Sequence, residues 1–97
     1  MPRAYETMLI VRPDVSEEPM TELVDLQKTT LTEGGASNIE VNIRGKRRLA
    51  YEIQRCREGI YVQINYDSEP SARTAMEKAL KLNESILRFA TFNVEEG

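Results

Sequence analysis

The chain has 97 residues, of which 40% are hydrophobic and 30% charged, and its formal net charge is −3 at pH 7. This length and mixture predict one globular domain over residues 1–97 with no membrane span, because no apolar run approaches the roughly 20 residues that cross a bilayer. One cysteine and no histidine exclude a disulfide within the chain, a zinc site made of several Cys and His ligands, and histidine-dependent nucleophilic catalysis.

The first predicted element is a strand over residues 5–11, which is almost continuously apolar after its second residue. Such a run is typical of a strand with neighbours on both sides. The sequence Arg12-Pro13-Asp14 breaks the strand, and Ser16 then provides an N-cap for a helix. Apolar side chains at helical spacing continue to Leu31, and two glycines end the helix. We expect Arg12 to pair with Asp14 or with a carboxylate of this helix.

A second strand begins near Ser37 with alternating apolar and polar side chains, and the same alternation resumes from Leu49 to Ile53. Between these stretches the buried face of the strand would have to hold Gly45 and Arg47. We therefore predict a β-bulge, or a projection of the strand beyond the sheet, around the glycine.

The segment over residues 54–59 is charged and ends in glycine, which predicts the turn of an antiparallel hairpin. The return strand then runs over residues 60–66. One of its faces is apolar, and the other carries Tyr61, Gln63 and Asn65. A second helix opens at Pro70 or Ser71 and ends at Asn83, and a last strand covers residues 86–94.

The predicted order of elements is strand, helix, strand, strand, helix, strand. Right-handed crossovers then place both helices on one face of a four-stranded antiparallel sheet. This is the α+β ferredoxin-like βαββαβ fold, with the first and third strands in the centre. The long second strand should therefore lie at an edge and extend past the sheet.

The strongest functional signal is a cluster of positive charge. Six of the 13 Lys and Arg residues fall within residues 44–57, where Glu52 is the only acid; we call this segment the basic tract. Phosphate affinity depends on the cations gathered at one surface and not on net charge, so the tract predicts binding to structured RNA. The predicted RNA contacts are Lys46, Arg47 and Arg48, then Arg44, with Arg3, Lys81 and Arg88 as secondary contacts.

An alternative interpretation of the basic tract is a solvated hairpin whose charges protect an edge strand from aggregation. The sequence leaves open whether Arg47 points to solvent or towards a carboxylate. On the open face of the sheet Tyr61 is the one clear aromatic residue, whereas an RNA-recognition motif stacks bases on two or three. We therefore predict that Tyr61 covers the sheet or meets a protein partner, and that Leu49, Tyr51 and Ile53 pack in the core or against that partner.

The string Gly45-Lys46-Arg47-Arg48-Leu49-Ala50-Tyr51-Glu52-Ile53 resembles the signature of the ribosomal protein six family of the bacterial small subunit. The resemblance extends over nearly the whole chain, through Tyr5-Glu6-Thr7, Arg12-Pro13-Asp14, Leu82-Asn83 and Ile86-Leu87-Arg88. Gln54 departs from the basic or small residue expected after the isoleucine.

This resemblance implies a non-catalytic component of the small ribosomal subunit. It implies binding to the central domain of small-subunit rRNA together with ribosomal protein eighteen, in the cytoplasm or in an organelle. No cofactor, metal, membrane or small-molecule substrate is expected. The acidic remainder of the chain would avoid coating RNA indiscriminately and could receive a basic protein partner.

Two other functions compete with this interpretation. An enzyme of the acylphosphatase kind shares the topology, but it would need a glycine-containing phosphate loop after the first strand, where Arg12-Pro13-Asp14 instead adds an acid. A ligand-sensing or oligomerising regulatory domain would pair through its sheet edges and would self-associate without RNA.

Overall fold

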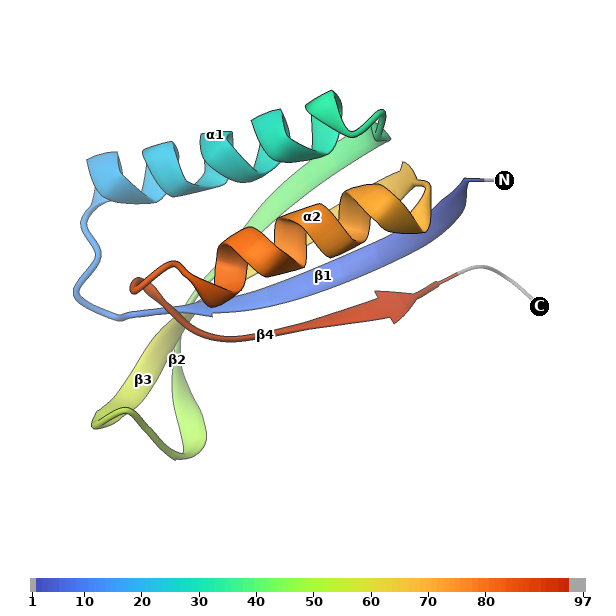
Figure 1. The fold of residues 1–97 in the computed structure, drawn as a ribbon. Helices are drawn as coiled ribbons and strands as arrows, with labels where there is room; N and C mark the ends of the chain where they lie inside the picture. The colour runs from blue at the N-terminus through green and yellow to red at the C-terminus, as the bar shows by residue number, and fades with distance from the viewer. Residues whose placement is uncertain (1, 95–97) are drawn as a thin grey trace.

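The computed structural model describes residues 2–94. Its elements follow the predicted order: β1 (Arg3–Val11), α1 (Glu17–Glu33), β2 (Ser37–Ile53), β3 (Cys56–Ser68), α2 (Pro70–Lys81) and β4 (Ile86–Asn93). The strands form one antiparallel sheet in the order β2-β3-β1-β4. Both helices cover the same face of this sheet (Figure 1). The predicted ferredoxin-like fold is confirmed, with β1 and β3 central and β2 at an edge.

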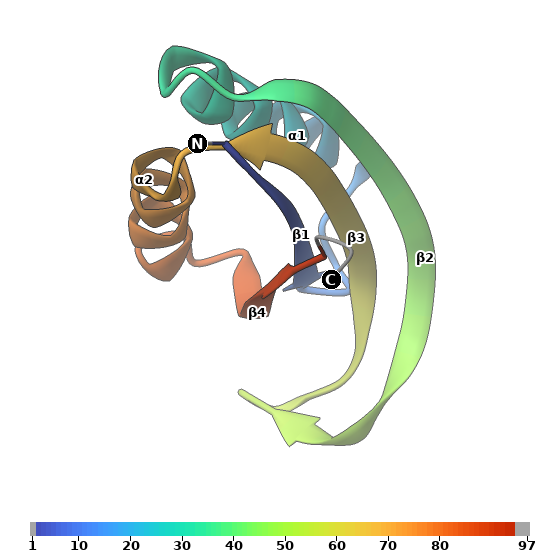
Figure 2. The same ribbon diagram turned by 90° about the vertical axis from the view of Figure 1, so that its right-hand side faces the viewer.

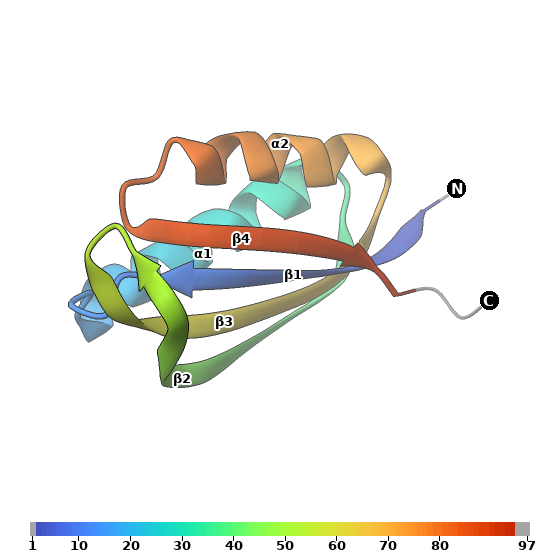
Figure 3. The same ribbon diagram turned by 90° about the horizontal axis from the view of Figure 1, so that it is seen from below.

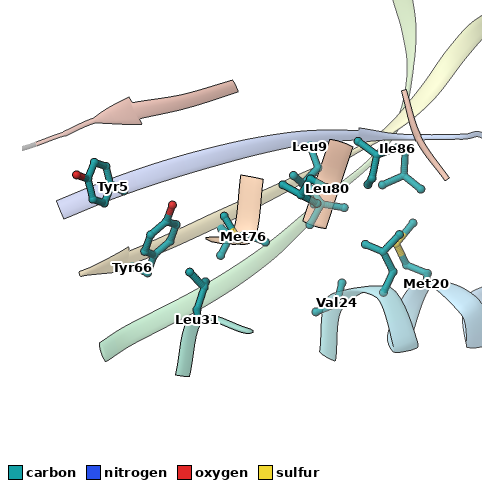
Figure 4. Close-up of a cluster of buried hydrophobic side chains, with 13 residues drawn as sticks. Tyr5, Leu9, Met20, Val24, Leu31, Tyr66, Met76, Leu80 and Ile86 are labelled. Atoms are coloured by element: carbon teal, nitrogen blue, oxygen red, sulfur yellow. The ribbon is translucent and has the colours of Figure 1, made fainter. Parts of the chain in front are cut away.

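The core lies between the sheet and the two helices. Alternate residues of β1 are buried under the helices, and the residues between them are half-buried on the open face, which explains why β1 is apolar almost throughout. Figure 4 shows the side chains that fill this layer, from β1, β3, both helices and the start of β4. Thr7 is the polar exception on β1. Its hydroxyl is hydrogen-bonded to the hydroxyls of Tyr66 (3.0 Å) and Thr91 (2.9 Å), which joins three strands inside the core.

The predicted bulge in β2 is confirmed. Ile43 pairs with Val62 and Gly45 pairs with Tyr61, so Arg44 is an extra residue that shifts the register. Gly45 has a φ of +96°, a left-handed conformation that glycine adopts without a steric penalty. Because the bulge inverts the alternation, Arg47 shares the face of Tyr61 and does not point towards the helices. The conflict seen in the sequence is resolved in this way.

The predicted antiparallel hairpin is confirmed, but its turn is shorter than the predicted range of residues 54–59. The hairpin turns at two residues only, Gln54 and Arg55, whose φ values of 47° and 67° give the positive torsions that tight hairpins require. Neither residue is glycine, so the usual sequence signal for this turn is missing. Gly59 instead lies buried within β3, where a Cβ atom would collide with the Cγ2 methyl of Ile10.

The β2–β3 hairpin continues well beyond the rest of the sheet. Beyond the bulge its two strands form a ribbon, residues 45–61, which we call the extended hairpin. Figures 2 and 3 show that this ribbon curls away from the helices and passes beneath the open face of the sheet, near the end of β1. The curl therefore brings the tip of one edge strand towards β4 at the opposite edge.

Candidate nucleic-acid interface

The charged side chains at the heart of the basic tract are free. Lys46, Arg47 and Arg48 are all exposed, and none of their side chains forms a hydrogen bond or an ion pair with any other residue of the described range 2–94. Two acids lie in the same hairpin, Glu52 and Glu58. Glu58 pairs with Arg48 across the two strands, but the two side chains form no ion pair. Glu52 approaches Arg57 at 3.9 Å, and both side chains are well exposed, so the pair is worth little. The three cations therefore remain available to a polyanion.

Arg44 is held in place by the open face of the sheet. Its Nε atom donates a hydrogen bond to Gln63 Oε1 at 2.9 Å, and Nη2 donates to the same oxygen. Gln63 in turn donates from Nε2 to Glu6 Oε1 (3.1 Å) and Asn65 Oδ1 (3.3 Å). This polar network runs from β2 across β3 to β1. It fixes the direction of the Arg44 guanidinium without giving it a carboxylate partner.

Arg12 fastens the tip of the extended hairpin. Its guanidinium donates to Gln54 Oε1 at 2.6 Å, to Cys56 Sγ at 3.6 Å and to the backbone carbonyl of Glu84 at 2.9 Å. The expectation that Arg12 pairs with Asp14 or a helix carboxylate is therefore wrong. The partners lie 42 to 72 residues away along the chain, and no local pattern could have indicated them. The same contacts leave no phosphate cradle of the acylphosphatase kind at this position.

Arg88 makes a second fastening from β4. Its Nη1 atom donates to the hydroxyl of Tyr51 at 2.6 Å, and its guanidinium lies 5.5 Å from the centre of the Tyr51 ring. Tyr51 is 60% exposed, and both its hydroxyl and its ring contact Arg88. The predicted RNA contact Arg88 and the predicted partner contact Tyr51 thus meet each other. Arg88 keeps donors on Nε and Nη2, because a guanidinium carries five.

The secondary contacts predicted from the sequence do not all gather at this surface. Lys81 is the last residue of α2 and lies beside the tip of the extended hairpin, where it lines a surface hollow with Arg12 and Gln54. Arg3 lies at the opposite end of the sheet. It is the first residue of β1 and pairs with Ser68, whereas the last residue of β1, Val11, pairs with Ile60 in the extended hairpin. Lys81 and Arg88 can therefore act with the basic tract, whereas Arg3 is remote from it.

The predicted partner residues have different environments. Leu49 is 9% exposed and lies against Gly59, so it belongs to the packing of the extended hairpin. Ile53 and Tyr61 are half-buried, and Tyr61 faces the open side of the sheet. Other large apolar side chains are more exposed: Ile43 (57%) on β2 and Phe92 (54%) on β4. Sequence reasoning did not select these two, although each lies on an edge strand.

Neither a metal site nor a membrane-spanning helix is found among the described residues. Within residues 2–94 no three His, Cys, Asp or Glu side chains are grouped in a way that could hold a metal ion. No helix in the same range is both long and apolar enough to span a membrane. The basic tract is therefore the best candidate site.

Comparison with known proteins gives one consistent family. The sequence model of a family described as "Ribosomal protein S6" matches residues 4–93. The small ribosomal subunit protein bS6 of Synechococcus sp. (strain JA-2-3B'a(2-13)) is 53% identical over 95 residues, which cover 97% of this chain and 99% of that protein. The bS6 protein of Gloeobacter violaceus (strain ATCC 29082 / PCC 7421) is 46% identical over 96 residues, or 99% and 100% of the two chains.

A solved structure agrees with these sequence relatives. The crystal structure of 30S ribosomal protein S6 from Thermotoga maritima superposes with a TM-score of 0.88 at 32% sequence identity. The superposition covers 96% of this chain and 88% of that one. The similarity therefore extends to the whole arrangement of strands and helices.

Proposed function

The chain belongs to the ribosomal protein S6 family, and from this premise we propose that it binds the central domain of small-subunit rRNA together with ribosomal protein eighteen. It is a structural, non-enzymatic component of the small ribosomal subunit. The proposal adds the RNA, the protein partner and the surfaces that meet them, in ribosomes of the cytoplasm or of an organelle.

The observation that carries the RNA contact is the free basic tract. Lys46, Arg47 and Arg48 project from a protruding ribbon without intramolecular partners in the described range. Cations at one surface release counterions from the RNA and supply affinity without reading base sequence. Lys81 and Arg88 lie near enough to the extended hairpin to widen this surface, and Arg44 adds a guanidinium of fixed direction.

The protein partner fits a different part of the molecule. The whole chain is acidic, with a net charge of −3, even though the basic tract is strongly positive. Its acidic remainder therefore suits a basic protein, and opposite charges speed and orient such association. The exposed apolar side chains on the two edge strands, Ile43 and Phe92, are the surfaces we assign to that partner.

A salt titration tests the RNA contact. Affinity for a transcript of the rRNA central domain would be measured by filter binding over a range of KCl concentrations, with and without ribosomal protein eighteen. If about four phosphates are contacted, the log–log slope should be roughly −3 to −4. Replacing Lys46, Arg47 and Arg48 together with alanine should flatten the slope by about 2–3 units, because each cation contributes nearly one.

The control removes positive charge from the helix side of the molecule. Replacing Lys28 and Lys78 with alanine should leave the slope unchanged, because both lie on the helices. Circular dichroism would verify that each variant is folded. An unchanged slope in the folded triple variant would refute the assignment of the basic tract to rRNA.

A further inference from the structure

The curl of the extended hairpin creates a hollow that the sequence did not foretell. It has a volume of about 430 Å³ and is lined by Met8, Arg44, Arg47, Arg48, Tyr61 and Gln63. Sequence reasoning gave the arginines to RNA and the tyrosine to a protein partner. The structure places them around one depression on the open face of the sheet, where the ribbon passes beneath it (Figure 3).

The floor of the hollow is suited to a flat apolar group. Tyr61 and Met8 come from the two central strands, β3 and β1, and both are half-buried. Gly45 is the residue paired with Tyr61 on the β2 side, and a Cβ there would meet only open space. Gly45 therefore adds no side chain of its own beside the Tyr61 ring. Base stacking uses such an aromatic face, and it tolerates any base because every base has a π-face.

The rim of the hollow is suited to phosphate. Arg47 and Arg48 are exposed and, within residues 2–94, their side chains have no hydrogen-bonding partner. Arg44 is held by Gln63, so its guanidinium is ordered before any ligand arrives. Arg44 reaches Gln63 on the open face, and Arg47 shares the face of Tyr61, whereas Arg48 pairs with Glu58 on the other face of the ribbon. Two guanidinium groups beside an aromatic floor match a group with one planar face and a phosphodiester on each side. The volume is also within the roughly 300–1,000 Å³ of ordinary ligand pockets.

We propose that this hollow binds one unpaired nucleotide of an RNA, with its base against Tyr61 and Met8 and its flanking phosphates on Arg44 and Arg47. The inference rests on the proposed RNA binding and goes beyond it. The basic tract alone would bind any folded RNA through its phosphates. The hollow adds a preference for RNA that carries an unpaired nucleotide beside a helix.

The test compares two RNA hairpins that share one stem, of which only one carries a single unpaired uridine. Their affinities for the protein would be measured at low salt, with and without ribosomal protein eighteen. The wild-type protein should bind the RNA with the unpaired uridine about tenfold more tightly, which is within the range of base–aromatic stacking. Tyr61→Leu should abolish that preference without changing affinity for the fully paired RNA, whereas Tyr61→Phe, which keeps the ring, should retain it.

A photo-crosslink gives a second readout that needs no variant. With 4-thiouridine at the unpaired position, the crosslinked peptide should contain Tyr61 or Met8. The nucleotide proposal is overturned, and the proposed function stands, if Tyr61→Leu binds both RNAs as the wild type does or if the crosslinked peptide contains neither Tyr61 nor Met8. Equal loss of affinity for both RNAs in Tyr61→Leu would also overturn it.

Two further outcomes separate this inference from its premise. If the wild type binds neither RNA under any of these conditions, the proposed RNA contact fails and the hollow fails with it. If ribosomal protein eighteen without RNA protects the Tyr61 peptide from hydrogen exchange, and RNA does not, the hollow is a protein-binding site and the nucleotide proposal is wrong.

Discussion

The tip of the extended hairpin depends on Arg12, and this dependence can be measured. Arg12→Met keeps the length of the side chain and removes its hydrogen bonds to Gln54, Cys56 and the Glu84 carbonyl. A hydrogen bond from a charged group contributes roughly 1.5–3 kcal/mol when buried. Arg12 is only half-buried and Gln54 is exposed, so we expect about 0.5–1 kcal/mol for the Gln54 bond and about 1–2 kcal/mol for the whole set.

The effect should be concentrated at the turn. Gln54 and Arg55 both have positive φ, and each such conformation costs a non-glycine residue roughly 1–2 kcal/mol. Without Arg12 the turn should open more often, and the amides of residues 51–58 should exchange hydrogen about five- to thirtyfold faster, as a loss of about 1–2 kcal/mol requires. The exchange rates of amides in the core strands should not change, except for those amides that exchange only through global unfolding.

A double-mutant cycle isolates the Arg12–Gln54 contact. Urea unfolding of Arg12→Met, Gln54→Ala and the double variant should give a coupling free energy of about 0.5–1 kcal/mol. Arg57→Met is the matched control, because Arg57 lies in the same hairpin and its one ion pair, with Glu52, is long and exposed; it should change neither stability nor exchange. Additive effects of the two mutations, or unchanged exchange at the tip in Arg12→Met, would refute the reasoning.

Two other predictions concern the core. Gly59→Ala should lower the free energy of unfolding by about 1–3 kcal/mol, because the new Cβ would collide with the Ile10 methyl. The loss should be smaller in an Ile10→Ala background. Equal losses in both backgrounds would contradict this reasoning. Burial raises the pKa of Tyr66 above its ordinary value of 10.0, although its hydrogen bond to Thr7 opposes the shift. The unfolded chain therefore loses this proton first, so the stabilisation is complete below pH 10 and declines as the pH rises through the folded-state pKa. Thermal unfolding between pH 9 and 12 should show a shallower alkaline decline for Tyr66→Phe than for wild type; parallel profiles would contradict the assignment.

The local pattern of the chain determined most of the fold. The almost continuous apolar run of β1 indicated a central strand, because both of its faces are covered to some degree. The alternation in β3 and the helical spacing of apolar residues placed both helices over one face. The bulge was also visible, because Arg47 could not occupy a buried position and Gly45 stood beside it. Each of these features depends on burial at neighbouring positions, which periodicity records.

The basic tract was likewise visible in the sequence, since charge and position on an edge strand are local properties. The contacts that surround the basic tract in the structure were not visible in the sequence. The turn at Gln54 and Arg55 has no glycine to indicate it, and its positive torsions occur in a hairpin whose tip is hydrogen-bonded to Arg12, the residue after β1. Residue pairs far apart in the chain, Tyr51 with Arg88 and Arg12 with Gln54, help to hold the ribbon against the sheet.

The sequence alone thus decided the order of the strands and helices, most of the residues that lie between the sheet and the helices, and the segment that carries the positive charge. The tertiary structure alone decided that this segment curls beneath the open face, so that its arginines line one hollow together with Tyr61. The physical reason is that twist and curl of a two-stranded ribbon depend on a bulge and on distant side-chain contacts. Those contacts leave no periodic trace in the chain.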